Sequence, residues 1–357
     1  MREREKINMR KQTLKGLAVG LVAVFALAAC GGSDTASDTV PADTTPAAPT
    51  GLACQVTDMG GVDDKGFNQA AYEGLQQAEA ELGVGIQYLE SQSDADYAPN
   101  LQSFIDQGCN VIITVGFLLA DATKAAAEAN PNVQFAIVDS NTSAANVQGL
   151  TFAANEGAFI TGYLSAAESK SGVVGTYGGI NIPPVAIWMQ GFALGVEYYN
   201  AQKGASVKVL GWDIAKQDGT FAGNFESLDD GRNIAKSMFD EGADIIFTVA
   251  GPVGLGSAAF AQETAGGLRL IGVDKDMAIS DSENASIYLG SALKGVSAAV
   301  FAAVQAALNG EGGGTDYLGT MANGGAGYVV SQEISAELQA ELDAVKAGII
   351  DGSIVTK

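Results

Sequence analysis

The chain has 357 residues, a formal net charge of −22 and no histidine. The absence of histidine excludes Ser-His-Asp and Cys-His catalysis and histidine metal sites, and no GxxxxGK[ST] motif is present to bind ATP. The acidic balance argues against nucleic acid and anionic lipid as partners, because both carry negative charge themselves.

The N-terminus has the pattern of an export signal. Lysines and arginines precede an uncharged apolar run from Gly16 to Ala29, which is shorter than the ~20 residues that span a bilayer. The run ends in Leu-Ala-Ala before Cys30 and resembles the bacterial lipobox, in which the cysteine receives a lipid. We therefore expect residues 1–29 to be a lipoprotein signal peptide and Cys30 to anchor the protein on the extracytoplasmic face of the cell membrane. The alternatives are a signal peptide with an incidental cysteine, or an uncleaved anchor.

A polar stretch follows the cysteine. Residues 31–50 consist of Gly, Ser, Asp, Thr, Pro and Ala with a single Val. This composition buries too little apolar surface to offset the entropy of ordering. We therefore expect residues 30–50 to form the acylated cysteine and a flexible linker.

From residue 51 onward, short apolar strands alternate with helical stretches, which predicts parallel sheets covered on both faces. About 300 residues exceed what one core usually supports, so we expect two doubly wound α/β lobes. Lobe one is expected to take residues 51–153 plus 277–312, and lobe two residues 154–276 plus 313–357. The expected strands are 53–58, 86–90, 111–115, 133–139, 147–152, 173–177, 207–212, 245–249, 268–274 and 286–289; the clearest helices are 67–82, 120–130, 156–169, 184–201, 228–241 and 294–308.

Cys54 and Cys109 are the cysteines of this body, and each opens an expected strand. In a doubly wound sheet of order 2-1-3 these two strands are parallel neighbours, with both thiols at the same edge. In an exported protein such a pair favours a disulfide. The alternative is two buried free thiols.

Polar residues follow several expected strands at their carboxyl ends, where parallel α/β sheets bind ligands. The acids Asp58, Asp139 and Asp274 stand at three such ends, Asn68 lies in the loop after the first strand, and Gly251 follows the strand 245–249. Asp58 and Asp139 could instead cap the following helices. The pair Asp63-Asp64 lacks the calcium-loop spacing, so we expect neither a metal nor a cofactor.

The loop after the first strand carries a family pattern. Residues 56–69 (VTDMGGVDDKGFNQ), 116–122 (GFLLADA), 135–139 (FAIVD), 155–159 (NEGAF) and 272–274 (GVD) resemble blocks of the basic membrane protein family of ABC-transporter lipoproteins. The resemblance covers residues 52–345 and implies a type I periplasmic-binding fold, with hinge crossings near residues 152–154 and 274–278. Two positions depart from the family pattern: Gly66 stands where Ser is usual, and Pro252 where Gly is commoner.

The resemblance also implies a site. A purine nucleoside would lie between the lobes with its base between Phe67 and Phe225. Asp58, Asn68 and Asp139 would meet the base or the ribose, Gly251 would bring backbone close to the ligand, and Asp274 and Lys294 would bind ribose hydroxyls. Phe67 could instead belong to the core, Phe221 is a rival for Phe225, and Lys294 could extend to solvent from a helix start.

These observations predict a solute-binding protein that passes a small ligand, a purine nucleoside by resemblance, to an ABC permease. The only membrane contact expected is the lipid anchor, and we do not expect an enzyme. Two alternatives stay open: a binding protein for another solute such as a sugar, riboflavin or a signalling molecule, and a carboxylate-dependent nucleoside hydrolase.

Overall fold

The computed structural model describes residues 51–141 and 143–357. The expected signal peptide, the acylated Cys30 and the linker fall on residues 1–50 and lie outside the described residues. No helix in the described ranges is both long and apolar enough to cross a membrane.

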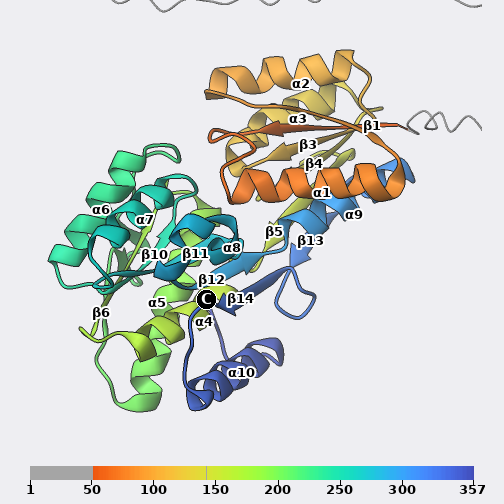
Figure 1. The fold of residues 1–357 in the computed structure, drawn as a ribbon. Helices are drawn as coiled ribbons and strands as arrows, with labels where there is room; N and C mark the ends of the chain where they lie inside the picture. The colour runs from red at the N-terminus through yellow and green to blue at the C-terminus, as the bar shows by residue number, and fades with distance from the viewer. Residues whose placement is uncertain (1–50, 142) are drawn as a thin grey trace, which may run out of the picture. The chain divides into compact units, whose positions relative to one another are not determined.

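The first sheet has six parallel strands in the order β13-β5-β4-β3-β1-β2. We call this sheet and the helices that cover it the first lobe (Figure 1). Its strands are β1 (Leu52–Thr57), β2 (Gly85–Leu89), β3 (Val111–Val115), β4 (Gln134–Val138), β5 (Val147–Phe152) and β13 (Asp316–Gly319). Its helices are α1 (Phe67–Leu82), α2 (Tyr97–Asp106), α3 (Ala120–Ala129) and α9 (Val296–Leu308), with short 3-10 turns η1 (Asp94–Asp96) and η2 (Phe117–Leu119).

Alternate residues of each central strand supply two cores. In β3, Ile113 packs into a cluster with residues of α1 and α9, whereas Ile112 packs with residues of α2. All five residues of this strand are buried, because helices cover both faces of the sheet. The apolar run 111–115 is therefore explained by burial from both sides.

The second sheet repeats this arrangement in the order β14-β12-β11-β10-β6-β7, with β14 antiparallel to β12. Phe247 packs toward α4 and α5, and Ile246 packs toward α6 and α7. We call this sheet and its helices the second lobe. Its strands are β6 (Val173–Gly178), β7 (Lys208–Leu210), β10 (Ile245–Val249), β11 (Arg269–Asp274), β12 (Tyr288–Lys294) and β14 (Ala326–Val330). Strands β8 (Trp212–Asp213) and β9 (Asp218–Gly219) form a separate antiparallel pair. Its helices are α4 (Ala154–Glu168), α5 (Pro183–Lys203), α6 (Leu228–Asp240), α7 (Val253–Glu263), α8 (Met277–Ser280) and α10 (Ala336–Ile350), with η3 (Ser282–Ile287).

Strand pairing places the chain crossings differently from the expected boundaries. The chain first crosses between β5, which ends at Phe152, and α4, which begins at Ala154. The expected crossing at 274–278 is wrong, because β12 continues the second sheet beside β11 as far as Lys294. The chain crosses there, between β12 and α9, and crosses back after β13, which pairs with β5 of the first sheet. Residues 277–294 and 313–319 thus belong to the opposite lobes from those expected.

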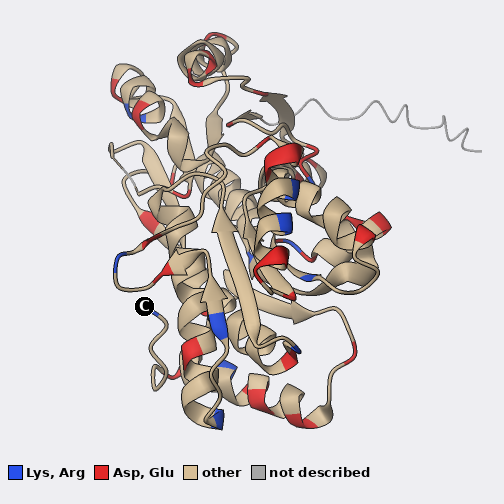
Figure 2. Ribbon diagram, turned by 90° about the vertical axis from the view of Figure 1, so that its left-hand side faces the viewer, with Lys and Arg blue, Asp and Glu red and all other residues tan. Residues whose placement is uncertain are grey.

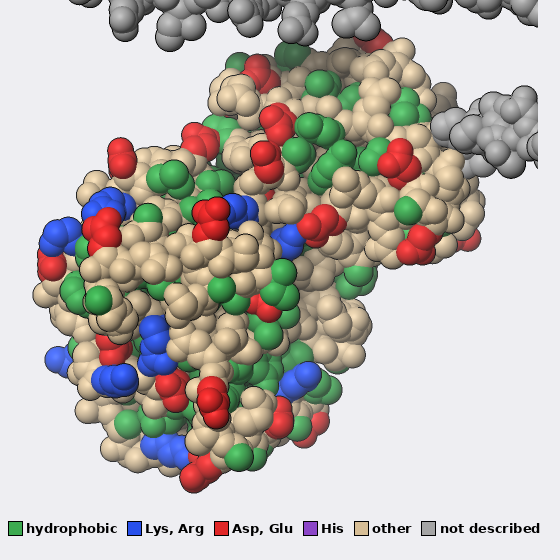
Figure 3. All heavy atoms as spheres, in the orientation of Figure 1, with side chains coloured by type: hydrophobic (Ala, Val, Ile, Leu, Met, Phe, Trp, Pro, Cys, Tyr) green, Lys and Arg blue, Asp and Glu red, His purple; other side chains and the backbone are tan. Residues whose placement is uncertain are grey.

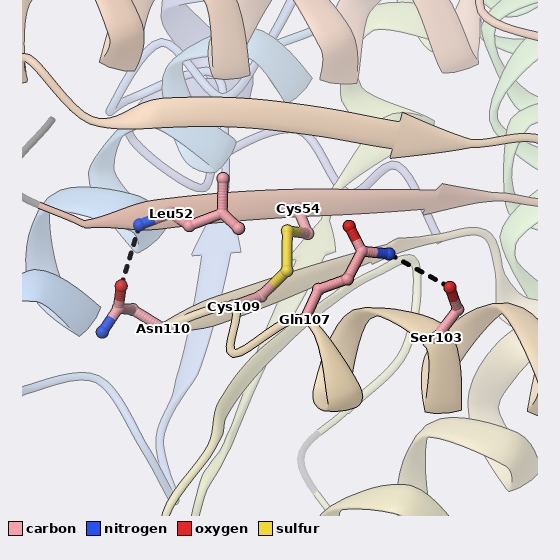
Figure 4. The surroundings of a disulfide bond; sticks show 6 residues. All are labelled: Leu52, Cys54, Ser103, Gln107, Cys109 and Asn110. Atoms are coloured by element: carbon pink, nitrogen blue, oxygen red, sulfur yellow. Dashed lines mark hydrogen bonds between the residues drawn. A yellow bond between two sulfur atoms is a disulfide. The ribbon is translucent and has the colours of Figure 1, made fainter.

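The disulfide between Cys54 and Cys109 is confirmed (Figure 4). It joins Cys54 of β1 to Cys109, which lies two residues before the start of β3, with the two Cα atoms 6.1 Å apart. The neighbouring pairing of β2, β1 and β3 is the 2-1-3 order expected from sequence. Both cysteines are buried in the core that α2 covers.

Acidic residues predominate over basic ones along the ribbon, in keeping with the net charge of −22 (Figure 2). On the face shown in Figure 3, basic side chains lie among acidic and apolar ones on the lower-left part, whereas the upper-right part shows acidic side chains. The excess of negative charge is therefore spread over the molecule and does not by itself mark a binding face on this side.

Candidate functional site

A cavity lies at the carboxyl ends of strands from both sheets and encloses about 580 Å³ of space free of protein atoms, part of it open to solvent. This is the position in which parallel α/β sheets bind ligands. All eight residues expected to bind ligand line it: Asp58, Phe67, Asn68, Asp139, Phe225, Gly251, Asp274 and Lys294.

Asp58 and Asn68 form a buried pair on the first-lobe wall. The Asn68 Nδ2 group donates to Asp58 Oδ1 at 3.0 Å and to the backbone oxygen of Met59 at 3.3 Å. Asn68 Oδ1 has no hydrogen-bond partner among the described residues. Burial raises the pKa of the Asp58 carboxyl to about 8, against the opposing effect of the Asn68 hydrogen bond.

Asp64 fixes the start of helix α1. Its carboxylate accepts hydrogen bonds from the backbone N–H groups of Gly66, Asn68 and Gln69, which the helix itself leaves unpaired. A negative charge at a helix N-terminus is stabilised by the helix dipole. Asp64 therefore holds the turn that carries Phe67 and Asn68 into the cavity, a role that sequence reasoning did not assign to it.

Gly116 makes room for the Asp58 side chain. Its φ of +114° lies in the region that favours glycine, and a Cβ atom there would come within 2.2 Å of Asp58 Oδ2. Gly251 follows the equivalent strand β10 of the second lobe and also has a positive φ, +54°. The two glycines mark corresponding positions of the two lobes.

Asp139 and Asp274 occupy matching strand ends and share the left-handed backbone conformation, each with φ of +67°. Such strain in non-glycine residues persists only where the surroundings enforce it, and it concentrates at functional sites. Both carboxylates face Lys294: its Nζ atom lies 2.7 Å from Asp139 Oδ2 and 3.4 Å from Asp274 Oδ1. These contacts outweigh the effect of burial and raise the pKa of Lys294, so the ammonium stays charged. The reading of Lys294 as a solvent-extended side chain is wrong, because the side chain is 3% exposed.

Aromatic rings surround the same ammonium group. Lys294 Nζ lies 4.4 Å from the ring centre of Phe67, 5.6 Å from that of Phe152 and 5.9 Å from that of Trp188. Cations at such distances are attracted by the ring faces. Phe67 is half-buried and also packs against the first-lobe core, so it can both belong to the core and line the cavity.

Phe225 reaches the cavity from the loop before α6. A Cβ atom at Gly179 would come within 2.2 Å of its ring, so only glycine lets the ring lie against that backbone. Phe221 packs instead against Trp212, with ring centres 6.4 Å apart, and does not line the cavity. The structure thus decides between the two phenylalanines in favour of Phe225 as the cavity residue.

Sequence reasoning missed the apolar part of the wall. The start of α5 contributes four side chains to it, Ile182, Pro184, Val185 and Trp188. The sequence does indicate where this helix begins. Pro183-Pro184 occupies its first turn, where proline is favoured, and follows strand β6 and its loop. Trp188 is 2% exposed and would have been read as core.

Comparison with known proteins decides what kind of site this is. Residues 52–357 match the model of a family described as ABC transporter substrate-binding protein PnrA-like, or Bmp. The chain belongs to this family. The expected resemblance to the basic membrane protein family is thereby confirmed.

Two curated relatives illustrate the match. The chain is 33% identical to the ABC transporter nucleoside-binding protein BmpA of Lactococcus lactis subsp. cremoris, over 97% of this chain and 99% of the relative. It is 32% identical to basic membrane protein A of Borreliella burgdorferi, over 83% of this chain and 85% of the relative.

Solved structures confirm the fold. A solute-binding protein of an ABC transporter system from Aeropyrum pernix K1 superposes with a TM-score of 0.75 at 24% identity, covering 86% of this chain and 93% of that one. AraP, an arabinose-binding protein from Geobacillus stearothermophilus, superposes with a TM-score of 0.58 at 16% identity, covering 83% and 99%. The fold is that of type I periplasmic solute-binding proteins, as expected.

The chain is therefore a substrate-binding protein of an ABC transporter and not an enzyme, in line with its family and structural neighbours. Proteins of this class are extracytoplasmic, bind small ligands and work with permease components.

Proposed function

We propose that this chain binds a purine nucleoside in the cavity between its two lobes and delivers it to a membrane permease. The observation that best supports this proposal is that aromatic rings and buried polar groups surround one cavity. Phe67 and Phe225 line it from the first and second lobe, and the cluster of Lys294, Asp139 and Asp274 lies beside Phe67. A flat base and a hydroxyl-rich sugar need those two kinds of surface.

The ribose would lie against the Lys294 cluster. Asp274 Oδ1 makes no hydrogen bond within the described residues, and its only cationic contact is Lys294 at 3.4 Å. The hydrogen-bonding capacity of this buried oxygen is thus not filled by Lys294, and a sugar hydroxyl would supply a further donor. Asp139 and Lys294 would then hold a second hydroxyl.

The base would lie between Phe67 and Phe225, with its edge toward Asp58 and Asn68. Stacking against aromatic rings is worth about 1–3 kcal/mol per base. The name of the Lactococcus lactis relative, a nucleoside-binding protein, supports the same ligand class for this chain.

Binding of one ligand by both lobes would stabilise the closed arrangement, which the permease would recognise. The lobes in this proposal comprise residues 51–153 with 296–319, and residues 154–294 with 326–357. The three chain crossings between them would be the hinges.

A panel of ligands tests the proposal. Purine nucleosides, free bases, sugars and riboflavin are added to the purified chain and its thermal unfolding is followed. A nucleoside at 100 times its dissociation constant should stabilise the folded state by about 2.7 kcal/mol. If a sugar or riboflavin raises the unfolding temperature and nucleosides do not, that compound and not a nucleoside is the ligand.

The lipid anchor belongs to the same proposal. Cys30 would carry a diacylglycerol group and keep the protein beside its permease. Cys30→Ser should release the protein from the membrane fraction and leave nucleoside binding unchanged. Recovery of that variant in membranes, as firmly as the unmodified sequence, would argue against the anchor.

A further inference from the structure

Asp58 is a buried carboxyl group of the cavity that forms no ion pair with the residues the structure describes. Lys294, the charged base of the site, is engaged by Asp139 and Asp274. Within residues 51–141 and 143–357, the one side-chain donor recorded for Asp58 is the neutral amide of Asn68. The Asp58 side chain is also enclosed, since the residue is 7% exposed and Gly116 packs against Oδ2.

The charged and titratable groups around Asp58 work against its ionisation. Asp64, in the loop before α1, and Asp139, after β4, both disfavour a second negative charge nearby, while Lys294 at the end of β12 opposes them. Tyr97 on α2 adds no negative charge near neutral pH, because burial raises the pKa of its phenol to about 12. Desolvation is the largest effect on Asp58, and it favours the neutral acid.

We propose that Asp58 is a specificity-determining residue that keeps its proton when the base binds and donates a hydrogen bond to it, while Asn68 Oδ1 accepts one. This inference rests on the proposed function. Asn68 is already oriented for it, because Nδ2 is used by Asp58 and Met59 and leaves Oδ1 unpaired in the described structure. The pair therefore presents one donor and one acceptor to the ligand.

This arrangement selects a class of base edge. It is complementary to an edge with an acceptor beside a donor, such as O6 and N1–H of a 6-oxopurine or N1 and the amino group of adenine. An ionised Asp58 would instead present two acceptors, which only an edge with two adjacent donors satisfies, such as N1–H and the 2-amino group of guanine. With Asp58 protonated, the pair of Asp58 and Asn68 should therefore bind inosine and guanosine with similar affinity.

The pH dependence has a defined sign. The binding-competent form of Asp58 carries a proton, so affinity is full below its pKa and falls as pH rises through it. With the pKa at about 8, about nine-tenths of the groups are protonated at pH 7 and about one-tenth at pH 9. Affinity of the native chain should therefore fall about tenfold between these pH values.

The test is calorimetric titration of inosine at pH 7 and pH 9 into the native chain and into Asp58→Asn, whose amide donates and accepts like a protonated carboxyl. The variant should bind within about threefold of the native chain at pH 7. The ratio of native to variant affinity should then fall about tenfold by pH 9, a ratio that cancels ionisation of the ligand itself. Asp121→Asn removes an exposed acid outside the cavity and should keep the native pH profile.

A tenfold or greater loss in Asp58→Asn at pH 7, with a constant affinity ratio up to pH 9, would overturn the inference, because Asp58 would then bind as an anion. Should the variant fail to fold, titrations of the native chain at pH 8 in two buffers of different ionisation enthalpy decide. Uptake of about half a proton per inosine is expected, and no uptake overturns the inference. If the native chain binds no nucleoside at either pH, the proposed function fails and this inference fails with it; nucleoside binding without proton linkage overturns the inference alone.

Discussion

Lys65 and Asp281 are separated by 216 residues and belong to different lobes, yet Lys65 Nζ lies 2.8 Å from Asp281 Oδ1. Asp281 is buried and also accepts hydrogen bonds from Asn284 and Tyr288 of its own lobe. A second ion pair joins Lys275 of the second lobe to Glu73 on α1, at 2.5 Å. Both pairs tie the second lobe to α1 or to the loop just before it, the segment that carries Phe67 and Asn68.

These ion pairs should favour the closed arrangement. Replacing both lysines, Lys65→Met with Lys275→Met, should weaken nucleoside affinity about 2–30-fold at low salt, since partly exposed pairs contribute about 0.2–1 kcal/mol each. The native affinity should fall with salt more steeply than that of the variant. Titrations at two salt concentrations measure this. Lys236→Met is the matched control, because its pair with Asp240 lies within α6; an equal effect there would contradict the assignment.

The disulfide should support the fold of the first lobe and leave the ligand site alone. Cys54 and Cys109 are 55 residues apart, and closing such a loop contributes up to about 4 kcal/mol in the chain-entropy model. The double variant Cys54→Ala with Cys109→Ala should lower the free energy of unfolding by an amount up to that value, measured by urea denaturation. Ligand affinity of the folded fraction should stay native. Alkylation of two thiols in the native, unreduced protein would show that the bond is absent.

Base and sugar contacts should separate by mutation. Phe67→Ala should weaken binding of both nucleoside and free base, by about 1–3 kcal/mol. Asp274→Ala should weaken nucleoside binding by about 1.5–3 kcal/mol and leave free-base affinity close to native, because the proposed site places Asp274 at the ribose and not at the base. Calorimetry of guanosine and guanine against both variants gives the comparison. Phe221→Ala, an aromatic residue outside the cavity, should bind both ligands as the native chain does.

The cavity should reject phosphorylated ligands. Among the described residues, four carboxyl groups line it, from Asp58, Asp64, Asp139 and Asp274, against the single ammonium of Lys294, which is already paired with Asp139 and Asp274. A phosphate dianion would find no free cation there and would meet like charges. Inosine 5′-monophosphate should bind at least 100-fold more weakly than inosine in parallel titrations. If inosine and inosine 5′-monophosphate bind with comparable affinity, the cluster of Lys294, Asp139 and Asp274 does not contact the sugar.

Much of the site could be predicted because strand ends are readable. Apolar runs ending at Asp58, Asp139 and Asp274 mark carboxyl edges of parallel strands, and the structure brings all three acids into one cavity. Phe67, Phe225 and Lys294 were expected only through family resemblance, since nothing in local spacing joins a helix start, a loop and a strand end.

The lobe boundaries could not be predicted for a physical reason. Strand β12 contains Gly290 and Ser291 between apolar residues, so its sequence resembles a strand that ends early. Strand β13 has four residues on a sheet edge and is only partly buried, which leaves little apolar signal. The first six residues of α5 are all apolar, yet only Val185 and Trp188 among them are buried, so the sequence shows no single apolar face that would indicate that Trp188 borders the cavity.

Direct titration of a purine nucleoside into the purified native chain tests the central claim. Calorimetry with inosine should show saturable binding of one nucleoside per chain, lost or strongly weakened in Phe225→Ala and retained in Phe221→Ala. Comparing these two variants tests whether the nucleoside binds in the cavity, because Phe225 lines the cavity and Phe221 does not. Absence of saturable nucleoside binding to the folded native chain, or equal binding by both variants, would contradict the account.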